Sequence, residues 1–451
     1  MTDRTDLADL TGEAVELLQA LIRNECVNDG TVESGHEVRS AELLQHFLEG
    51  AGLDVERFEE EPGRTSIVAR IEGSDPDAPS LCLMGHTDVV PVNPAGWSRD
   101  PFGGELVDGE VWGRGAIDML NLTATMAVAF RHLARTGFTP QGTLIFYAVA
   151  DEEAGGTWGA EWMVDRCWDA IGCDYLVSEL GGWSERGADG VRRVAVSVAE
   201  KGLAWRRLSI SGTPGHGSMP YGADNALITA AEIVRRLADY SPAPYIDDVW
   251  QAGVEGMDVD PELKAALLDP DRLDEALRQL PVAQAKGCHA RTHTTFSPNV
   301  LHGGQKTNVI PDHVDLEVDI RTVPGVTPED VDGYLREALG DLMERVTVGR
   351  IQTGLATRST MDSPLWDALA RQISAGDPTI ELQPNLMVGG TDARFFRNKG
   401  TVAFGTGLFS PAVTAGEFAS RFHGNDERVD VESLTLTLDL WLGLARQLLD
   451  T

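Results

Sequence analysis

An apolar segment that ends in a histidine and an aspartate, LCLMGHTD, places the strongest constraint on the fold of this chain. Its first residues, Leu81 to Met84, are apolar enough for a buried strand, and Gly85 is then followed by His86 and Asp88. Open α/β folds bind their ligands beyond the carboxyl ends of buried strands. The segment therefore predicts a sheet edge that carries chemically active groups.

Three later segments also place an acidic residue where an apolar or glycine-rich run ends. Asp118 follows VWGRGAI, Glu152 and Glu153 follow TLIFYAVAD, and Glu179 follows DYLVS. Imidazoles and carboxylates are the ligands of hydrolytic metal sites. Each residue alone has a plainer explanation, because a Glu-Glu pair is commonly surface charge and Asp118 could cap a following helix. Their shared position after strands favours a metal site.

Strand-like and helical segments alternate along the first part of the chain, which predicts an α/β fold with a mainly parallel sheet. The expected strands cover residues 54–58, 66–71, 81–84, 143–149 and 175–177. The expected helices cover residues 14–22, 38–47, 122–133 and about 158–167. The last segment, 434–449, alternates like a strand, but its length and spacing favour a helix.

The pattern changes near residue 200, where alternating strands and one amphipathic helix indicate a smaller α+β domain. We expect residues 1–200 to form the first part of a catalytic domain and 346–451 its second part. Residues 201–345 would form the inserted domain, in which the acidic segment 242–286 is a further insertion.

Composition restricts the partners of the chain. Lys and Arg number 37 against 71 Asp and Glu, a net charge of −34, which disfavours nucleic acid and anionic membranes. The start MTDRTDLADL lacks the features of a signal peptide, and no apolar run is long enough to span a membrane. The five cysteines form no CxxC motif, which indicates reduced thiols. We expect a cytoplasmic protein.

Eight motifs occur in a fixed order: GHTDVVP, GRGAIDM, ADEEAGG, VSE, HGS, TNVIP, GGTDARFF and FHGNDE. Together they make the chain similar, from about residue 15 onward, to the dinuclear-zinc amidohydrolase and peptidase family. That family includes aminoacylases, acetylornithine deacetylase, succinyl-diaminopimelate desuccinylase and glutamate carboxypeptidases. The resemblance implies a mainly parallel-sheet catalytic domain with an inserted α+β lid and dimerisation domain.

The resemblance also implies two divalent metal ions, with Zn²⁺ expected and Co²⁺ or Mn²⁺ as alternatives. The implied ligands are His86 and Glu179 for one ion, Glu153 and His423 for the other, and Asp118 as the bridge. Glu152 would be the general base and acid, and Asp88 would orient His86. His423 lies in a polar segment, and only the resemblance identifies it. A cis peptide bond is expected between Asp118 and Met119.

Residues of the inserted domain would contact the substrate. His216 in TPGHGSMP matches a histidine that, in relatives, reaches the partner subunit's active site and stabilises the oxyanion, so a homodimer is implied. Asn308 matches a substrate contact, and Arg321 a residue that binds the substrate carboxylate, although Arg321 could also form an ordinary ion pair. Gly390 and Thr391 match a turn that lines the pocket. The other seven histidines are expected to be structural.

The predicted activity is hydrolysis of an amide next to a free carboxylate, in an N-acyl amino acid or at the C-terminal residue of a short peptide. A dipeptidase or a biosynthetic deacylase on the same site is the nearest alternative. A non-catalytic relative that only binds small molecules should lack a metal ligand or the general base. Here all six matched positions, the five implied metal ligands and Glu152, are intact. The chain has no G-x-S-x-G motif of a serine hydrolase. The insertion and the unusual EEAGGTWGAEW segment leave the acyl group and side-chain preference open.

Overall fold

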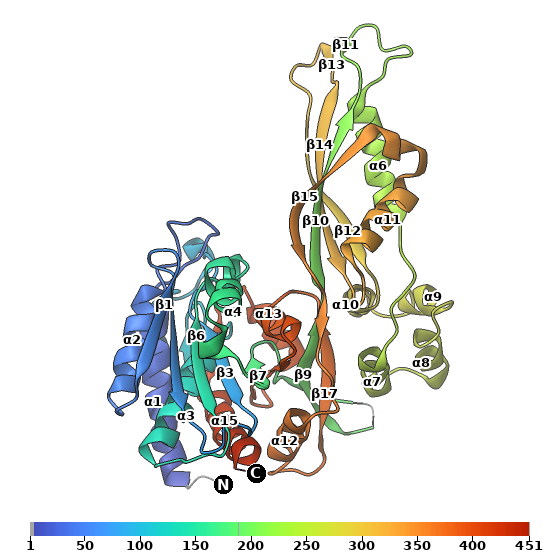
Figure 1. Cartoon of the computed structure of the whole chain (residues 1–451). Coiled ribbons are helices and arrows are strands. Elements are labelled where there is room, and N and C mark those ends of the chain that lie inside the picture. Colours follow the sequence, from blue (N-terminus) through green and yellow to red (C-terminus); the bar gives the residue numbers. More distant parts are fainter. Residues whose placement is uncertain (1–3, 188, 451) are drawn as a thin grey trace. The chain divides into compact units, whose positions relative to one another are not determined.

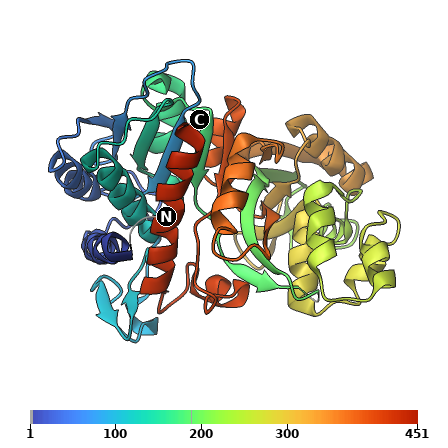
Figure 2. The same cartoon turned by 90° about the horizontal axis from the view of Figure 1, so that it is seen from below.

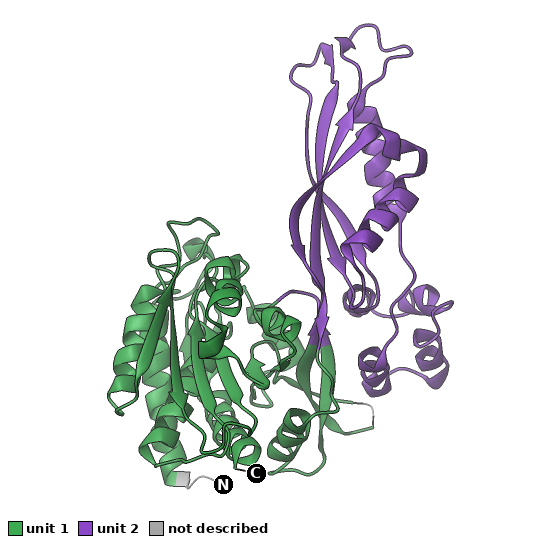
Figure 3. Ribbon diagram, viewed as in Figure 1, with its two compact units in different colours: residues 1–198, 359–385, 391–451 green, residues 199–358, 386–390 purple. Residues whose placement is uncertain are grey.

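The computed structural model describes residues 4–187 and 189–450 and divides the chain into two compact units (Figure 3). Unit 1 consists of Met1–Val198, Ser359–Asn385 and Thr391–Thr451. Unit 2 consists of Ala199–Arg358 and Leu386–Gly390. The first unit is therefore assembled from separate parts of the sequence.

Unit 1 contains a large mixed sheet whose central strands are parallel (Figure 1). Along it the strand order is β1-β2-β6-β3-β7-β18-β9, and β3 pairs in parallel with both β6 and β7. The strands are β1 (Val55–Glu59), β2 (Thr65–Ile71), β3 (Leu81–His86), β6 (Leu144–Val149), β7 (Tyr175–Ser178), β9 (Arg192–Glu200) and β18 (Val402–Gly405). Strands β8 (Ser184–Arg186) and β17 (Ile380–Met387) pair with β9. Every residue of β3 and β6 is buried, which explains their unbroken apolar sequences.

Helices cover both faces of this sheet. On one face, α3 (Leu120–Arg135) packs on β3 and against α1 (Arg4–Arg23) and α15 (Val431–Leu449), the red helix of Figure 2. On the other face, residues of α4 (Trp162–Arg166), α5 (Trp168–Ile171) and α13 (Ala393–Asn398) share a buried apolar cluster with the strands. The remaining helices of the unit are α2 (Val38–Glu49), α12 (Pro364–Ile373) and α14 (Ala415–Arg421). A small antiparallel sheet joins β4 (Glu105–Val107), β5 (Glu110–Trp112) and β19 (Arg428–Asp430).

Unit 2 is built on an antiparallel four-stranded sheet in the order β12-β14-β10-β15. The strands are β10 (Gly202–Ser211), β12 (Thr295–Gly303), β14 (His313–Thr322) and β15 (Val346–Gly354). Buried residues alternate along β10 and β14, because only one face of the sheet packs against α6 (Ala226–Asp239) and α11 (Pro328–Leu339). A short ribbon pairs β11 (Gly215–His216) with β13 (Val309–Ile310). Strand β16 (Thr357–Arg358) pairs antiparallel with the end of β9 and is the last strand of the large sheet.

The acidic insertion of unit 2 forms four short helices with an apolar core of their own. The helices are α7 (Asp248–Gly256), α8 (Pro261–Leu267), α9 (Leu273–Leu277) and α10 (Val282–Thr292). Their core is centred on Trp250, whose indole nitrogen donates a hydrogen bond to the Leu267 carbonyl at 2.8 Å. This core shares no residue with the cluster beneath α6 and α11.

The structure also shows where local sequence patterns were misleading. A single helix expected near 158–167 is broken: Thr157–Glu161 forms a π-type turn with non-helical torsions at Gly159, and α4 begins at Trp162. A Cβ at Gly159 would lie only 1.7 Å from the Ala150 carbonyl oxygen, so this close packing determines the local path. The strand beginning at Val346 pairs with β10, so the expected start of the second catalytic part lies inside the sheet of unit 2.

The ambiguous C-terminal segment is helical, as expected. Asp430 caps α15 by accepting a hydrogen bond from the Ser433 amide. Its apolar residues exceed one helical face because α15 contacts α1, α3 and α12. Among the described residues, no helix is long and apolar enough to cross a membrane.

Candidate metal centre

His86 lies at the carboxyl end of β3, where the buried strand presents it to a group of carboxylates. Its Nδ1 lies 3.0 Å from the backbone carbonyl oxygen of Asp88. A carbonyl can only accept, so Nδ1 carries a proton, and in the neutral ring that binds a metal the lone pair is on Nε2. Nε2 lies 3.2 Å from Asp118 Oδ1 and 3.7 Å from Glu179 Oε2. The imidazole thus directs its lone pair at two acidic side chains.

Asp118 lies between two histidines from distant parts of the chain. Its Oδ1 faces His86, and its Oδ2 lies 2.9 Å from His423 Nε2, which is also 3.4 Å from Glu153 Oε2. The side chains form two groups of potential ligands, His86 with Asp118 and Glu179, and Asp118 with Glu153 and His423. Within each group the ligand atoms lie within 4.8 Å of one another. Asp118 belongs to both groups, as a bridging ligand would.

Asp88 fixes the loop that carries the adjacent glutamates. Its carboxylate accepts hydrogen bonds from the amides of Glu152 at 3.3 Å and Glu153 at 3.0 Å. Asn28 Nδ2 donates to the same carboxylate at 2.9 Å. The Asp88 carboxylate is also 3.5 Å from His86 Nδ1. One buried aspartate therefore contacts both the histidine and the Glu-Glu backbone.

A buried ion pair supports Asp118 and His423, and sequence reasoning missed it. Glu427 Oε1 accepts hydrogen bonds from the amides of Ile117 at 2.7 Å and Asp118 at 3.1 Å. Arg114 donates to Glu427 at 2.5 Å and to the His423 carbonyl at 3.3 Å. Glu427 lies within the FHGNDE motif, but nothing local shows that it binds amides near residue 118. The expected cis peptide between Asp118 and Met119 is present.

A second buried network, also missed from sequence, continues from Asn28. Its amide donates to Asp151 Oδ1 at 3.1 Å as well as to Asp88. Arg64 forms an ion pair with Glu37 at 2.8 Å and lies 3.6 Å from Asp151. Asn28, Glu37 and Arg64 are separated in sequence and lie in none of the eight motifs, so only the folded chain shows that they support the loop of Asp151.

The electrostatics of the centre require added positive charge. Burial, and then the charge of Asp118, raise the pKa of Glu179 to about 8 and that of Glu153 to about 7. Burial and the charge of Glu179 raise the pKa of Glu152 well above its usual value. Burial opposes protonation of His423, yet hydrogen bonds with Asp118 and Glu153 raise its pKa to about 10. Buried carboxylates that outnumber the cations near them fit bound metal ions.

Two further groups of predicted residues lie in separate places. In unit 2, His216 and Asn308 lie together at the β11–β13 ribbon, where the Gly217 amide donates to the Asn308 carbonyl at 2.8 Å. His216 is exposed, and its Nδ1 is 2.8 Å from Ser218 Oγ. Arg321, near the end of β14, donates to Asp319 at 2.8 Å.

Gly390 and Thr391 lie where the chain passes between the two units. Thr391 is buried, and its hydroxyl accepts a hydrogen bond from the Ala393 amide at 3.2 Å. Asp392 follows, and burial raises the pKa of its carboxyl to about 7. The helix-cap explanation of Asp118 is wrong, because Met119 holds the N-cap position of α3 and provides no side-chain cap.

A mainly parallel sheet with imidazoles and carboxylates gathered at its carboxyl edge defines a metal-dependent hydrolase. Comparison with protein families matches residues 82–447 to peptidase family M20/M25/M40. The chain belongs to this family, and it is a metal-dependent hydrolase of amide bonds.

Individual relatives agree with this assignment. The chain is 28% identical over 407 residues to aminoacylase-1 of Sus scrofa, covering 89% of this chain and 88% of the relative. It is 27% identical over 426 residues to succinyl-diaminopimelate desuccinylase of Rhodospirillum centenum, covering 94% of both chains. The fold is similar to that of the M20 metallo-carboxypeptidase Sso-CP2 of Sulfolobus solfataricus, with a TM-score of 0.73, 19% identity and coverage of 97% and 99%.

Proposed function

We propose that this protein hydrolyses amides whose amine side carries a free carboxylate, either N-acyl amino acids or short peptides at their C-terminal residue. The observation that carries the proposal is the pair of ligand groups that share Asp118, together with Glu152, which directly precedes Glu153 in the chain. The ligands would be His86, Asp118, Glu153, Glu179 and His423. Three of these are carboxylates and two are imidazoles, a set that suits Zn²⁺ and also accepts Co²⁺ or Mn²⁺.

When bound, two such ions lower the pKa of water and polarise the amide carbonyl. Glu152 is the proposed general base: its carboxylate would accept a proton from water and return it to the leaving nitrogen. Asp88 positions Glu152 through its backbone amide. His216 would donate a hydrogen bond to the developing oxyanion of a substrate held by a partner subunit.

Arg321 is the proposed partner of the substrate carboxylate, because a guanidinium binds a carboxylate through two parallel charge-assisted hydrogen bonds. Its present partner, Asp319, would have to share or release it. Arg321→Gln should raise KM by about 10- to 100-fold for substrates with a free carboxylate, since a lost charged hydrogen bond costs about 1.5–3 kcal/mol. Arg207→Gln, at an exposed ion pair on β10, is the matched control.

A substrate panel tests the reaction class. N-acyl amino acids, the corresponding acyl amines without a carboxylate, and dipeptides would be compared by kcat/KM. Preference for acyl amino acids supports the deacylase, and preference for dipeptides supports the dipeptidase alternative. Equal rates for acyl amines and acyl amino acids would contradict the proposed carboxylate requirement.

We also propose a homodimer, because the role proposed for His216 requires a second subunit. Apolar side chains are exposed near His216, at Met219 and Tyr221, and on α6, at Leu227 and Ile228, which suits association of unit 2 with a second copy. Light scattering of the full chain should give twice the monomer mass. In mixed dimers of His216→Ala and Glu152→Gln subunits, partial recovery of activity would support action between subunits, and no recovery would contradict it.

A further inference from the structure

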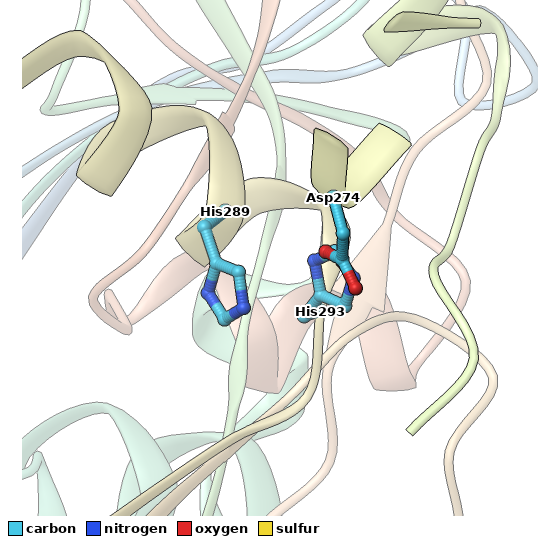
Figure 4. A group of neighbouring side chains, drawn as sticks. All are labelled: Asp274, His289 and His293. Carbon is cyan, nitrogen blue, oxygen red and sulfur yellow. The ribbon is translucent and has the colours of Figure 1, made fainter. Parts of the chain in front are cut away.

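The helices α9 and α10 of unit 2 and the residue after α10 carry another group of metal-ligating side chains, which the proposed hydrolytic site does not use. Asp274 comes from α9, His289 from α10, and His293 from the residue after α10 (Figure 4). Each offers one ligand atom, and the three atoms lie within 4.8 Å of one another. The family motifs include none of these residues.

Hydrogen bonding fixes the tautomer of His293. The Thr292 hydroxyl donates to the Cys288 carbonyl at 2.8 Å and lies 3.0 Å from His293 Nδ1. Because that hydroxyl proton is already donated, Thr292 accepts from Nδ1–H. The lone pair of His293 is therefore on Nε2. A hydrogen bond to the other ring nitrogen, as Thr292 forms here, holds a metal-binding histidine in position.

The Nε2 atom of His293 is fully buried and has no hydrogen-bond partner among the residues that the structure describes. It lies 3.5 Å from Asp274 Oδ1, so a lone pair faces a carboxylate oxygen. Buried polar atoms are almost always satisfied, and two facing acceptors need a cation or a proton between them. The Asp274 side chain is 58% exposed, which gives an ion a path from solvent.

His289 provides the third ligand atom one helical turn earlier. The two imidazole rings stack with their centroids 4.2 Å apart and an angle of 8° between planes, so the exposed edge of the site has to adjust by rotation of the His289 ring before both rings direct a nitrogen at one ion. Lys201 is the nearby cation, but its amine donates to the His293 backbone carbonyl at 2.7 Å and has no bond with His293 Nε2.

We propose that Asp274, His289 and His293 bind a divalent transition-metal ion of the Zn²⁺ type, with water completing the coordination. Two imidazoles and one carboxylate suit Zn²⁺, Co²⁺ or Ni²⁺ rather than Mg²⁺ or Ca²⁺. The ion would join α9 to the start of β12, which follows His293. The insertion has a small core of its own, so such a link would stabilise it against local unfolding.

Metal analysis of the full-length protein tests this site. After equilibration in a zinc-buffered solution, the wild type should hold about one zinc ion per chain more than Asp274→Asn or His289→Gln. Both variants should keep wild-type hydrolytic rates, because the proposed catalytic ligands are untouched. Asp271→Asn and His302→Gln, at exposed positions, are the matched controls and should retain the additional ion.

Hydrogen exchange gives an independent measurement. Zinc should slow amide exchange in α9 and α10 of the wild type, and Asp274→Asn should remove this protection. Equal zinc content in the wild type and both folded variants, or equal protection in Asp274→Asn, would overturn the proposal. Failure of the hydrolytic proposal would appear in a different experiment, as a Glu152→Gln variant that keeps normal turnover.

Discussion

Glu152 is the residue on which the proposed chemistry depends most directly. Glu152→Gln keeps the size of the side chain but cannot accept a proton, so turnover should fall by about 10²- to 10⁴-fold. Metal content should not change, because Glu152 belongs to neither ligand group. Steady-state kinetics with metal analysis measures both effects. Glu161→Gln, at an exposed position on the following turn, should behave as the wild type. A Glu152→Gln enzyme with near-normal kcat would remove this residue from its role.

Glu427 should matter for stability as well as for activity. Glu427→Gln leaves the buried Arg114 guanidinium without its negative partner, which should cost about 3 kcal/mol of the free energy of unfolding. Activity should fall too, because Glu427 holds the Ile117 and Asp118 amides. Urea denaturation measures the first effect. Glu105→Gln removes an exposed ion pair with Arg99 and should change stability by less than about 1 kcal/mol. Similar losses in the two variants would contradict the structural role of Glu427.

Single residues were predictable where a short motif follows a buried strand. His86 and Glu179 could be proposed because strand ends place polar groups at one sheet edge, whereas Asp118 lies in the turn before α3. Glu427 could not, because its partners are 309 and 310 residues away in sequence. Asn28 and Arg64 act only through contacts that folding creates. Supporting residues of this kind carry no local signal.

At the scale of elements, the contact between β3 and α3 controls the position of His86. Gly85 packs so closely that an added Cβ would lie 2.4 Å from Thr123 Oγ1, and this hydroxyl donates to the His86 carbonyl at 2.8 Å. Gly85→Ala should therefore lower the free energy of unfolding by about 1–3 kcal/mol and reduce kcat. Chemical denaturation and kinetics would measure the two changes.

A strand glycine in open space is the matched control. Gly354, the last residue of β15, has no atom within 4 Å of an added Cβ. Gly354→Ala should leave stability within about 0.5 kcal/mol of the wild type. If Gly85→Ala were equally harmless, the close packing of β3 on α3 would not constrain the site.

Helices and strands were predictable where a local sequence pattern alone determines the secondary structure. The buried strands β3 and β6 and the capped helix α15 follow from apolar runs, length and end signals. The break at Gly159 depends instead on a close approach to the Ala150 carbonyl, which no local pattern encodes. Likewise, β15 pairs with β10, about 140 residues earlier, so an alternating pattern alone could not assign it to a sheet.

At the scale of the whole molecule, metal ions should determine how stability depends on pH. Without metal, the folded protein holds carboxyls of raised pKa, about 7 for Glu153 and about 8 for Glu179, and His423 at about 10. The usual values are 4.5 for glutamate and 6.5 for histidine. Between about pH 5 and pH 8 the folded state therefore binds more protons than the unfolded state, and the free energy of unfolding falls as pH rises.

Bound divalent ions replace those protons as the balancing charge, so the loaded protein should lack this decline. Thermal unfolding of chelator-treated and zinc-reloaded protein at about pH 5.5 and about pH 8.5 compares the two states directly. Chelation should lower Tm at both pH values, and more strongly at the higher one. Glu179→Gln removes one of the repelling carboxylates and should reduce the slope in the metal-free protein. Metal-free protein that became more stable as pH rose would show that the buried carboxylates do not repel one another, and that the centre is not held together by cations.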